Sequence, residues 1–204
     1  MVKFAYAVGQ IRSIEALMLT SSHLLRMADA KDFSSSFFVL SETSYAKKID
    51  LLSKSFDFAE LLGMEYAFVK KLLTDLSGPS PILSALWKKH EDPSLPENEY
   101  MKLLSNVLSD NPNRLFENYV NSFISLYQKK ATAHGSQHII EKEIDNKLLE
   151  IIKSAKFKSF GIEPLIGFWV GKEMEMKNIK LILNAKLLGI ETDEIKQRMR
   201  DSYV

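Results

Sequence analysis

Residues 139–156 read IIEKEIDNKLLEIIKSAK, and their apolar side chains recur with the period of an α-helix. The positions i, i+4, i+7, i+8 and i+11 are held by Ile144, Leu148, Ile151, Ile152 and Ala155. This spacing places the apolar side chains on one face of a helix. Two other sets have a similar spacing: Ile11, Ile14, Leu17 and Met18, and Ile179, Ile182, Leu183 and Leu187. The pattern predicts an all-α fold.

Glycine and proline, with 8 and 6 residues in 204, are too scarce for the turns of an all-β chain of this length. Those present mark helix boundaries, because glycine ends helices and proline is tolerated in their first turn. The predicted boundaries are a helix end at Gly78-Pro79, a helix from Asn111-Pro112 through Leu126, one from Ser136 to about Lys158, one from Glu163-Pro164 to Gly189, and a short last helix capped by Thr192. We expect roughly eight to ten helices in total.

The segment Glu91–Asn98, EDPSLPEN, is the most loop-like part of the sequence, with two prolines among acidic residues. Exposed segments rich in proline and polar residues commonly connect domains. We therefore divide the chain into an N-terminal helical half at 1–90, an acidic, proline-containing linker at 91–110 and a C-terminal helical half at 111–204.

Composition argues against several classes of protein. Lys and Arg number 27 and Asp and Glu 26, whereas a dedicated nucleic-acid-binding protein is strongly basic. The absence of cysteine excludes disulfides and thiolate metal clusters. The longest apolar run, Leu165–Val170, is far shorter than the about 18 residues of a membrane-spanning helix, and we expect residues 1–13 not to act as a signal peptide. A soluble protein, or one that lies beside a membrane, is expected.

His134, His138 and Glu141 have a metal-like spacing of i, i+4 and i+7, which on a continuous helix could hold a divalent ion. Gly135 and Ser136 interrupt such a helix, so we favour a loop histidine followed by two solvated first-turn residues. No histidine has a glutamate three residues before it, no glycine-rich loop is present, and no Gly-x-Ser-x-Gly motif marks a nucleophile. We therefore expect no catalytic, cofactor-binding or metal-ligating residue.

Three polar residues lie among apolar neighbours at helical positions. Glu175 and Asn178 are three residues apart and share one side of the long C-terminal helix, and Arg12 follows Ile11. Such groups are costly to bury unpaired. Either they face solvent, or they satisfy one another, with Arg12 as a partner of Glu175 and Asn178.

The last 45 residues contain a proline, an aromatic pair, Lys-Glu, Glu-x-x-Asn-Ile-Lys, a Lys-x-x-Gly end and a closing Tyr-Val. These are Pro164, Phe168-Trp169, Lys172-Glu173, Glu175, Asn178, Ile179, Lys180, Lys186, Gly189 and Tyr203-Val204. The segment resembles the C-terminal part of the C subunit of the archaeal and bacterial A/V-type ATPase, a relative of the d subunit of vacuolar ATPases. Two further segments match in the family's order: Tyr6, Arg12, Leu40, Glu42, Thr43 and Tyr45, and then Glu141, Ile144, Asp145 and Leu148.

The two ends of the chain also resemble each other. Leu24, Phe37 and Tyr45 have counterparts at the same spacing in Ile182, Ile195 and Tyr203. A unit of helix, connection, short helix and tyrosine therefore occurs twice. The resemblance implies pseudo-symmetric multi-helix bundle repeats arranged as a funnel. Family members are usually longer and have three repeats, whereas this chain has room for about two, so we expect a shortened funnel.

The resemblance implies a non-catalytic, peripheral subunit that couples the central stalk of a rotary ATPase to its membrane ring during transport of H⁺ or Na⁺. It would lie on the cytoplasmic face of the membrane, with the stalk subunits and the ring as partners and without nucleic acid or cofactor. The family-motif positions, expected to be structural, are Arg12, Tyr45, Asp145, Pro164, Glu173, Glu175, Asn178 and Tyr203. The alternatives are a free-standing helical adaptor that kept the fold and a helical enzyme or metal protein centred on His134, His138 and Glu141.

Overall fold

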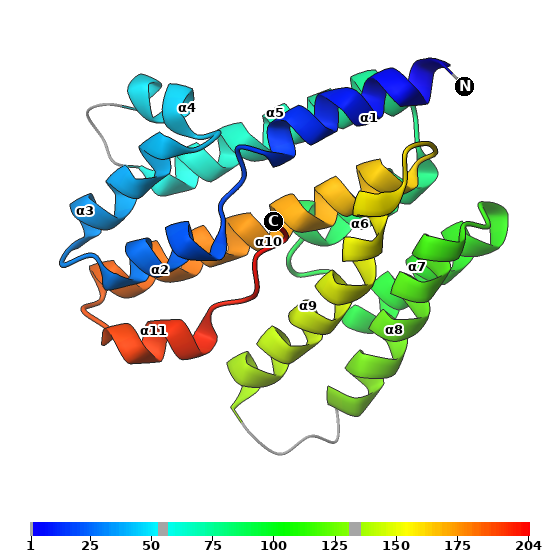
Figure 1. Ribbon diagram of the computed structural model, residues 1–204. Coiled ribbons are helices and arrows are strands. Elements are labelled where there is room, and N and C mark those ends of the chain that lie inside the picture. The colour runs from blue at the N-terminus through cyan, green and yellow to red at the C-terminus, as the bar shows by residue number, and fades with distance from the viewer. Residues whose placement is uncertain (1, 53–56, 131–135) are drawn as a thin grey trace.

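A computed structural model describes residues 2–52, 57–130 and 136–204 of the chain, and these residues form helices without any strand (Figure 1). The helices are α1 (Val2–Glu15), α2 (Ser21–Asp29), α3 (Phe33–Phe38), η1 (Val39–Glu42), α4 (Ala46–Leu51), α5 (Phe58–Ser77), α6 (Pro81–Glu91), α7 (Glu97–Asp110), α8 (Arg114–Lys130), α9 (Gln137–Lys153), η2 (Ser154–Phe157), α10 (Glu163–Leu187) and α11 (Thr192–Arg198). The all-α prediction is confirmed. The described residues hold more helices than expected, because α3 and α4 have six residues each and are too short to show a period.

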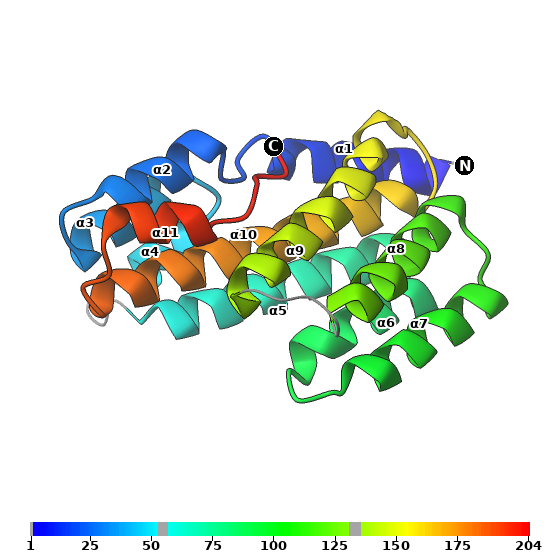
Figure 2. The same ribbon diagram turned by 90° about the horizontal axis from the view of Figure 1, so that it is seen from below.

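Helix α10 is the centre of the molecule. It runs lengthwise through the structure in both views and contacts α1, α2, α3, α5, α8, α9 and α11 (Figure 1 and Figure 2). Its residues are buried on nearly all sides, as expected of a helix that is apolar all round. One core cluster surrounds its N-terminal half together with α6 to α9, and a second packs α2, α3 and α11 around its C-terminal half.

Most of the predicted helix ends hold. Gly78 follows α5 with a φ of 74°, and Gly189 follows α10 with a φ of 67°, a backbone conformation that favours glycine. The start of α8 is a correction. Asn111 ends α7, its N–H donating to the Val107 carbonyl at 2.9 Å, whereas the Asn113 side chain accepts the Phe116 N–H at 3.0 Å and caps α8.

Two further boundaries also need correction. The sequence predicts that Thr192 caps the last helix, but this residue lies inside α11, and its hydroxyl donates to the Ala28 carbonyl at 3.3 Å. The helix that begins after Ser136 ends at Lys153 and is followed by the short helix η2, which is close to the expected end. The tertiary contact of Thr192 has no signal in the local sequence.

The acidic segment 91–110 is mostly helical. Helix α7 begins directly after Pro96, and its Tyr100 and Leu104 are buried in the same core cluster as residues of α6, α8 and α10. Only residues 92–96 form a connection. The division of the chain at this segment stays a prediction. None of the helices in the described ranges has the length and apolarity needed to cross a bilayer.

Candidate functional site

A buried ionic network lies at the middle of α10. Lys172 and Glu175 are three residues apart on this helix and therefore share a face. Both side chains are buried, and Glu65 of α5 is fully buried against them. Because an unpaired charge is very costly in a core, the sequence can hold these groups inside only if they satisfy one another.

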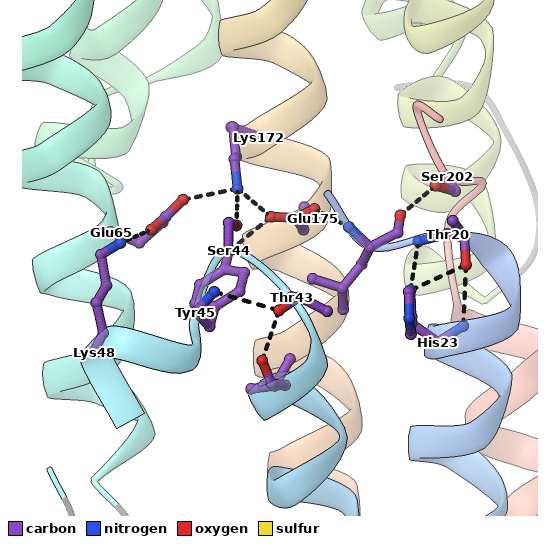
Figure 3. A network of polar contacts seen from close by, with 12 residues as sticks. Thr20, His23, Thr43, Ser44, Tyr45, Lys48, Glu65, Lys172, Glu175 and Ser202 are labelled. Carbon is purple, nitrogen blue, oxygen red and sulfur yellow. Dashed lines mark hydrogen bonds and ion pairs between the residues drawn. The ribbon is translucent and has the colours of Figure 1, made fainter. Parts of the chain in front are cut away.

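Lys172 is the cation at the centre of this network (Figure 3). Its Nζ lies 2.7 Å from Glu175 Oε1 and 2.8 Å from Glu65 Oε1, and it donates to Ser44 Oγ at 3.0 Å. Lys48 of α4 binds the other oxygen of Glu65, at 2.8 Å. Two lysines thus face two glutamates, and the buried cluster is neutral overall.

Glu175 connects two chain segments to α10. One carboxylate oxygen accepts the Tyr45 hydroxyl at 2.9 Å, and the other accepts the backbone N–H of Leu19 at 2.6 Å. The Leu19 carbonyl accepts the Ser202 hydroxyl at 2.6 Å, so the C-terminal segment joins the same connection (Figure 3). Three segments, those of Leu19, Tyr45 and α10, therefore meet at one carboxylate, and the C-terminal segment joins them through Leu19.

The network raises the pKa values of Lys172 and Tyr45. Burial disfavours the charged form of Lys172, but the carboxylates of Glu175 and Glu65 outweigh burial and raise the pKa of Lys172. Burial, together with the nearby Glu175 and Glu65 carboxylates, raises the pKa of Tyr45 well above its ordinary value. Lys172 stays charged and Tyr45 stays a neutral hydrogen-bond donor at physiological pH.

A second polar cluster fastens the C-terminal segment. Asp145 of α9 accepts from Lys177 at 3.0 Å and from Arg200 Nε at 2.9 Å. Burial alone would raise the pKa of Asp145, but the two cations lower it. The Asn178 side chain donates to the Arg200 carbonyl at 3.0 Å and accepts the Arg200 N–H at 2.8 Å. Glu173 lies 3.6 Å from Lys177 at the edge of this cluster.

Arg12 has a different environment from the one expected. It does not pair with Glu175 or Asn178; it binds Glu15 at 2.5 Å and donates to the carbonyls of Ala155 and Lys156 at 2.9 and 2.8 Å. The prediction of an Arg12 tie to α10 was wrong, because Lys172 and Leu19 already satisfy Glu175 and the Arg200 backbone already satisfies Asn178.

Tyr203 packs on a glycine face of α10. A Cβ on Gly171 would lie 2.5 Å from the Tyr203 ring, and one on Gly167 would lie 2.9 Å from its hydroxyl and 2.6 Å from Ala155. Both positions therefore need glycine for α10 to approach its neighbours. Pro164, in the first turn of the same helix, is also buried.

A groove of about 870 Å³ runs along α10 beside the Asp145 cluster. Its walls come from α5, α8, α9 and α11, and its lining includes Leu62, Tyr66, Met176, Lys180 and Leu188. Most charged groups on its walls are engaged: Asp145 binds Lys177 and Arg200, and Lys130 binds Glu141. The groove lining is therefore more apolar than polar, and most of its charged groups are paired.

The metal hypothesis gains no support from the part of the chain that can be described. His134 lies outside that part. His138 contacts the Ser136 hydroxyl at 2.6 Å, and Glu141 accepts from Lys130 and Gln137 at 2.9 and 3.0 Å. Across residues 2–52, 57–130 and 136–204, no three histidine or acidic side chains are placed to hold a metal ion.

Sequence reasoning identified Glu175 and Asn178 but missed Glu65 and Lys48. Glu65 had a usable signal: it occupies an apolar stripe of α5 at four-residue intervals, between Leu61 and Val69. A lone carboxylate on such a stripe indicates a buried partner. Lys48 and Ser44 carried no such signal, since Lys48 lies in a six-residue helix and Ser44 lies in the turn before it.

Comparison of the sequence with known proteins identifies a family. The family described as ATP synthase (C/AC39) subunit matches residues 91–198, more than half of the chain. The chain belongs to this family. The resemblance seen in the motifs is thereby confirmed.

Three relatives carry names from the same family. The C subunit of the A-type ATP synthase of Pyrococcus furiosus is 22% identical over 222 residues, which cover 95% of this chain and 59% of the relative. The protein of the same name from Methanocaldococcus jannaschii is 39% identical over 62 residues, or 30% of this chain and 16% of that one. The C subunit of the V-type sodium ATPase of Enterococcus hirae is 34% identical over 76 residues, or 33% and 23%.

The chain thus matches less than two thirds of the length of each of these relatives. No solved structure matches the chain significantly.

Proposed function

We propose that this protein is a non-catalytic, peripheral subunit of a rotary A/V-type ATPase that couples the central stalk to the membrane ring. The observation that carries the proposal is the family match over residues 91–198. Relatives named as the C subunits of an A-type ATP synthase and of a V-type sodium ATPase support it.

The packing of α10 suits a part that transmits torque. A coupling element must resist shear between its helices, and separating buried ion pairs is strongly unfavourable. The Lys172 network joins α10 to α5, to α4 and to the connection after α1, while Asn178 fixes the C-terminal segment. A central helix held on several sides by buried polar contacts is a stiff element.

Co-purification tests the assembly. The affinity-tagged protein, isolated from its native host with mild detergent, is expected to recover the catalytic, stalk and ring subunits in fixed stoichiometry. Recovery without stalk and ring subunits, in repeated preparations that contain intact rotary complexes, would contradict the proposal and favour the free-standing adaptor.

A coupling assay tests the role within the assembly. In inverted membrane vesicles that lack the protein, ATP hydrolysis by the catalytic head is expected to continue while ATP-driven ion uptake is lost. Tyr45→Phe, which removes one hydrogen bond of the network, is expected to lower ion uptake per ATP hydrolysed. Tyr203→Phe is the matched control. Unchanged ion uptake in vesicles without the protein would contradict a coupling role.

A further inference from the structure

The short segment between α9 and α10 exposes two phenylalanines. Phe157, at the end of η2, is 88% exposed, the largest value among the large apolar side chains of the described residues, and Phe160 is 59% exposed. Exposing a phenylalanine ring to water costs free energy in proportion to its apolar surface area. Two such rings three residues apart, in a segment read AKFKSF, need a physical explanation.

The rings are held outward by a well-built scaffold. The Arg12 guanidinium donates to the carbonyls of Ala155 and Lys156, and at 3.3 Å to that of Lys158. Arg12 is itself fixed by the buried carboxylate of Glu15. The Lys158 N–H closes a turn onto the Ala155 carbonyl at 3.0 Å, and Ala155 is fully buried against α10. The backbone that carries Phe157 is therefore fixed with its ring exposed, and the exposed Phe160 follows three residues later.

The same segment is basic. Lys153, Lys156 and Lys158 flank the two rings, and residues 151–162 contain no acidic side chain. Glu15 is paired with Arg12. Glu150 and Glu163 border this range, Glu150 at an exposed position of α9 and Glu163 accepting from Asn113 at 3.0 Å. Lys156 extends over the Tyr203 ring, with its Nζ 4.5 Å from the ring centroid. The charge that this surface presents is positive.

We propose that residues 153–160, which we name the Lys-Phe surface, bind an anionic phospholipid bilayer. Phe157 and Phe160 enter the boundary between headgroups and acyl chains, and the ammonium groups of Lys153 and Lys158 contact lipid phosphates while their apolar stems lie along the surface. An acidic protein partner would match the charge, but two outward-facing rings beside lysines suit a deformable lipid interface. The N-terminal end of α10 then faces the membrane, an orientation that the family assignment alone does not give.

Vesicle binding by the purified full-length chain tests this proposal. We expect the chain to co-sediment with vesicles of phosphatidylcholine and phosphatidylglycerol but weakly with phosphatidylcholine alone, and the binding to weaken as salt is raised. Phe157→Ala with Phe160→Ala is expected to lower the partition coefficient roughly tenfold, and Lys153→Glu with Lys158→Glu by at least as much.

A matched control lies at the opposite end of α10. Leu187 and Leu188 are exposed to a similar extent, so Leu187→Ala with Leu188→Ala removes comparable apolar surface and is expected to leave vesicle binding unchanged. All variants alter exposed or half-exposed side chains, and circular dichroism verifies that each is folded. Equal binding by the phenylalanine variant and the parent chain, or no binding of the parent chain to anionic vesicles, overturns the proposal.

Cross-linking in cells separates a lipid from a protein occupant. A photoreactive phenylalanine at position 157 is expected to form lipid adducts in the membrane fraction. A protein adduct as the main product would overturn the lipid assignment. This outcome is independent of the coupling proposal, which depends on the recovery of stalk and ring subunits.

Discussion

Tyr45 and Tyr203, which the sequence predicts to be counterparts in a repeated unit, are both buried but are held in different ways. Tyr45 donates its hydroxyl to Glu175 inside a network of charges. Tyr203 places its ring on Gly171, and its buried hydroxyl has no hydrogen-bond partner among the described residues. Tyr45 is therefore held by a hydrogen bond inside a charged network, whereas Tyr203 is held by packing on Gly171 beside the charges of Glu15 and Arg12.

The helix beside each tyrosine carries the same arrangement of charges. Arg12 and Glu15 on α1, like Lys172 and Glu175 on α10, form a basic–acidic pair three residues apart. The acid of the α10 pair accepts a tyrosine, whereas the base of the α1 pair binds carbonyls of residues 155–158. Glu15, the acid of the α1 pair, also lies near a tyrosine, since burial and the charge of Glu15 raise the pKa of Tyr203, but the two pairs differ in the other groups that they bind.

The largest effect is expected from removing Lys172, the central cation of the buried network around Tyr45. Lys172→Met leaves Glu65 and Glu175 facing each other without their shared lysine and is expected to lower the free energy of unfolding by about 3–5 kcal/mol. Urea denaturation measures the change. Lys180→Met, at an exposed position of the same helix, is the control and should stay within about 0.5 kcal/mol. A loss below about 1 kcal/mol for Lys172→Met would mean that the network adds no more than a surface pair.

Removing each tyrosine hydroxyl compares the two ends directly. Tyr45→Phe deletes a hydrogen bond to a buried carboxylate and is expected to cost about 2 kcal/mol. Tyr203→Phe deletes a buried hydroxyl on which, among the described residues, only the nearby charges of Glu15 and Arg12 act, and it is expected to cost less than Tyr45→Phe. Thermal and urea unfolding of both variants provide the comparison. Equal losses would show that the two tyrosines are held alike.

The contact between Tyr203 and α10 is tested by adding a methyl group at Gly171. Gly171→Ala places a Cβ against the Tyr203 ring and is expected to destabilise by about 1–3 kcal/mol, because the ring must move. Gly63→Ala is the matched control: its Cβ meets nothing within 4 Å in α5, and alanine should stabilise that helix by about 0.5–1 kcal/mol. Opposite signs in urea denaturation are the expected result. A neutral Gly171→Ala would indicate that Tyr203 has room to shift.

Local sequence was sufficient for the long helices but not for their partners. Helix α10 could be predicted from Pro164 and Gly189 at its ends and from the helical spacing of its apolar side chains, and the buried Glu175 and Asn178 stood out because they lie among those side chains. These are signals carried within one helix. The carbonyls that bind Arg12 lie more than 140 residues away, and no local pattern encodes such a contact.

Other errors arose where the local sequence allows more than one helix boundary. Asn111 and Asn113 are both good caps, and only the path of the chain after α7 decides that Asn113 caps α8. The short helices α3 and α4 are set by burial of Phe37 and Ile49 rather than by periodicity. Tertiary packing selected among alternatives that the sequence alone left open.

The smallest effect concerns the charges that fasten the segment leading to Tyr203. Asp145 binds Lys177 and Arg200, and Asp145→Asn is expected to cost about 1 kcal/mol at neutral pH, since Lys177 is partly exposed and water screens the pair. The folded-state pKa of Asp145 lies below its ordinary 3.8, so the stabilisation is present above that value and is lost as the pH falls through the folded-state pKa. The stability difference between parent and variant should therefore shrink in acid.

Urea denaturation at a series of pH values measures this difference. Asp75→Asn removes an exposed carboxylate that pairs with Lys71 within α5, and it should change stability by no more than a few tenths of a kcal/mol at any pH. If the Asp145→Asn difference stayed constant from neutral pH down to acid, the loss would come from packing and not from charge. The C-terminal end would then depend on close packing alone, and its contrast with the charged network around Tyr45 would be sharper still.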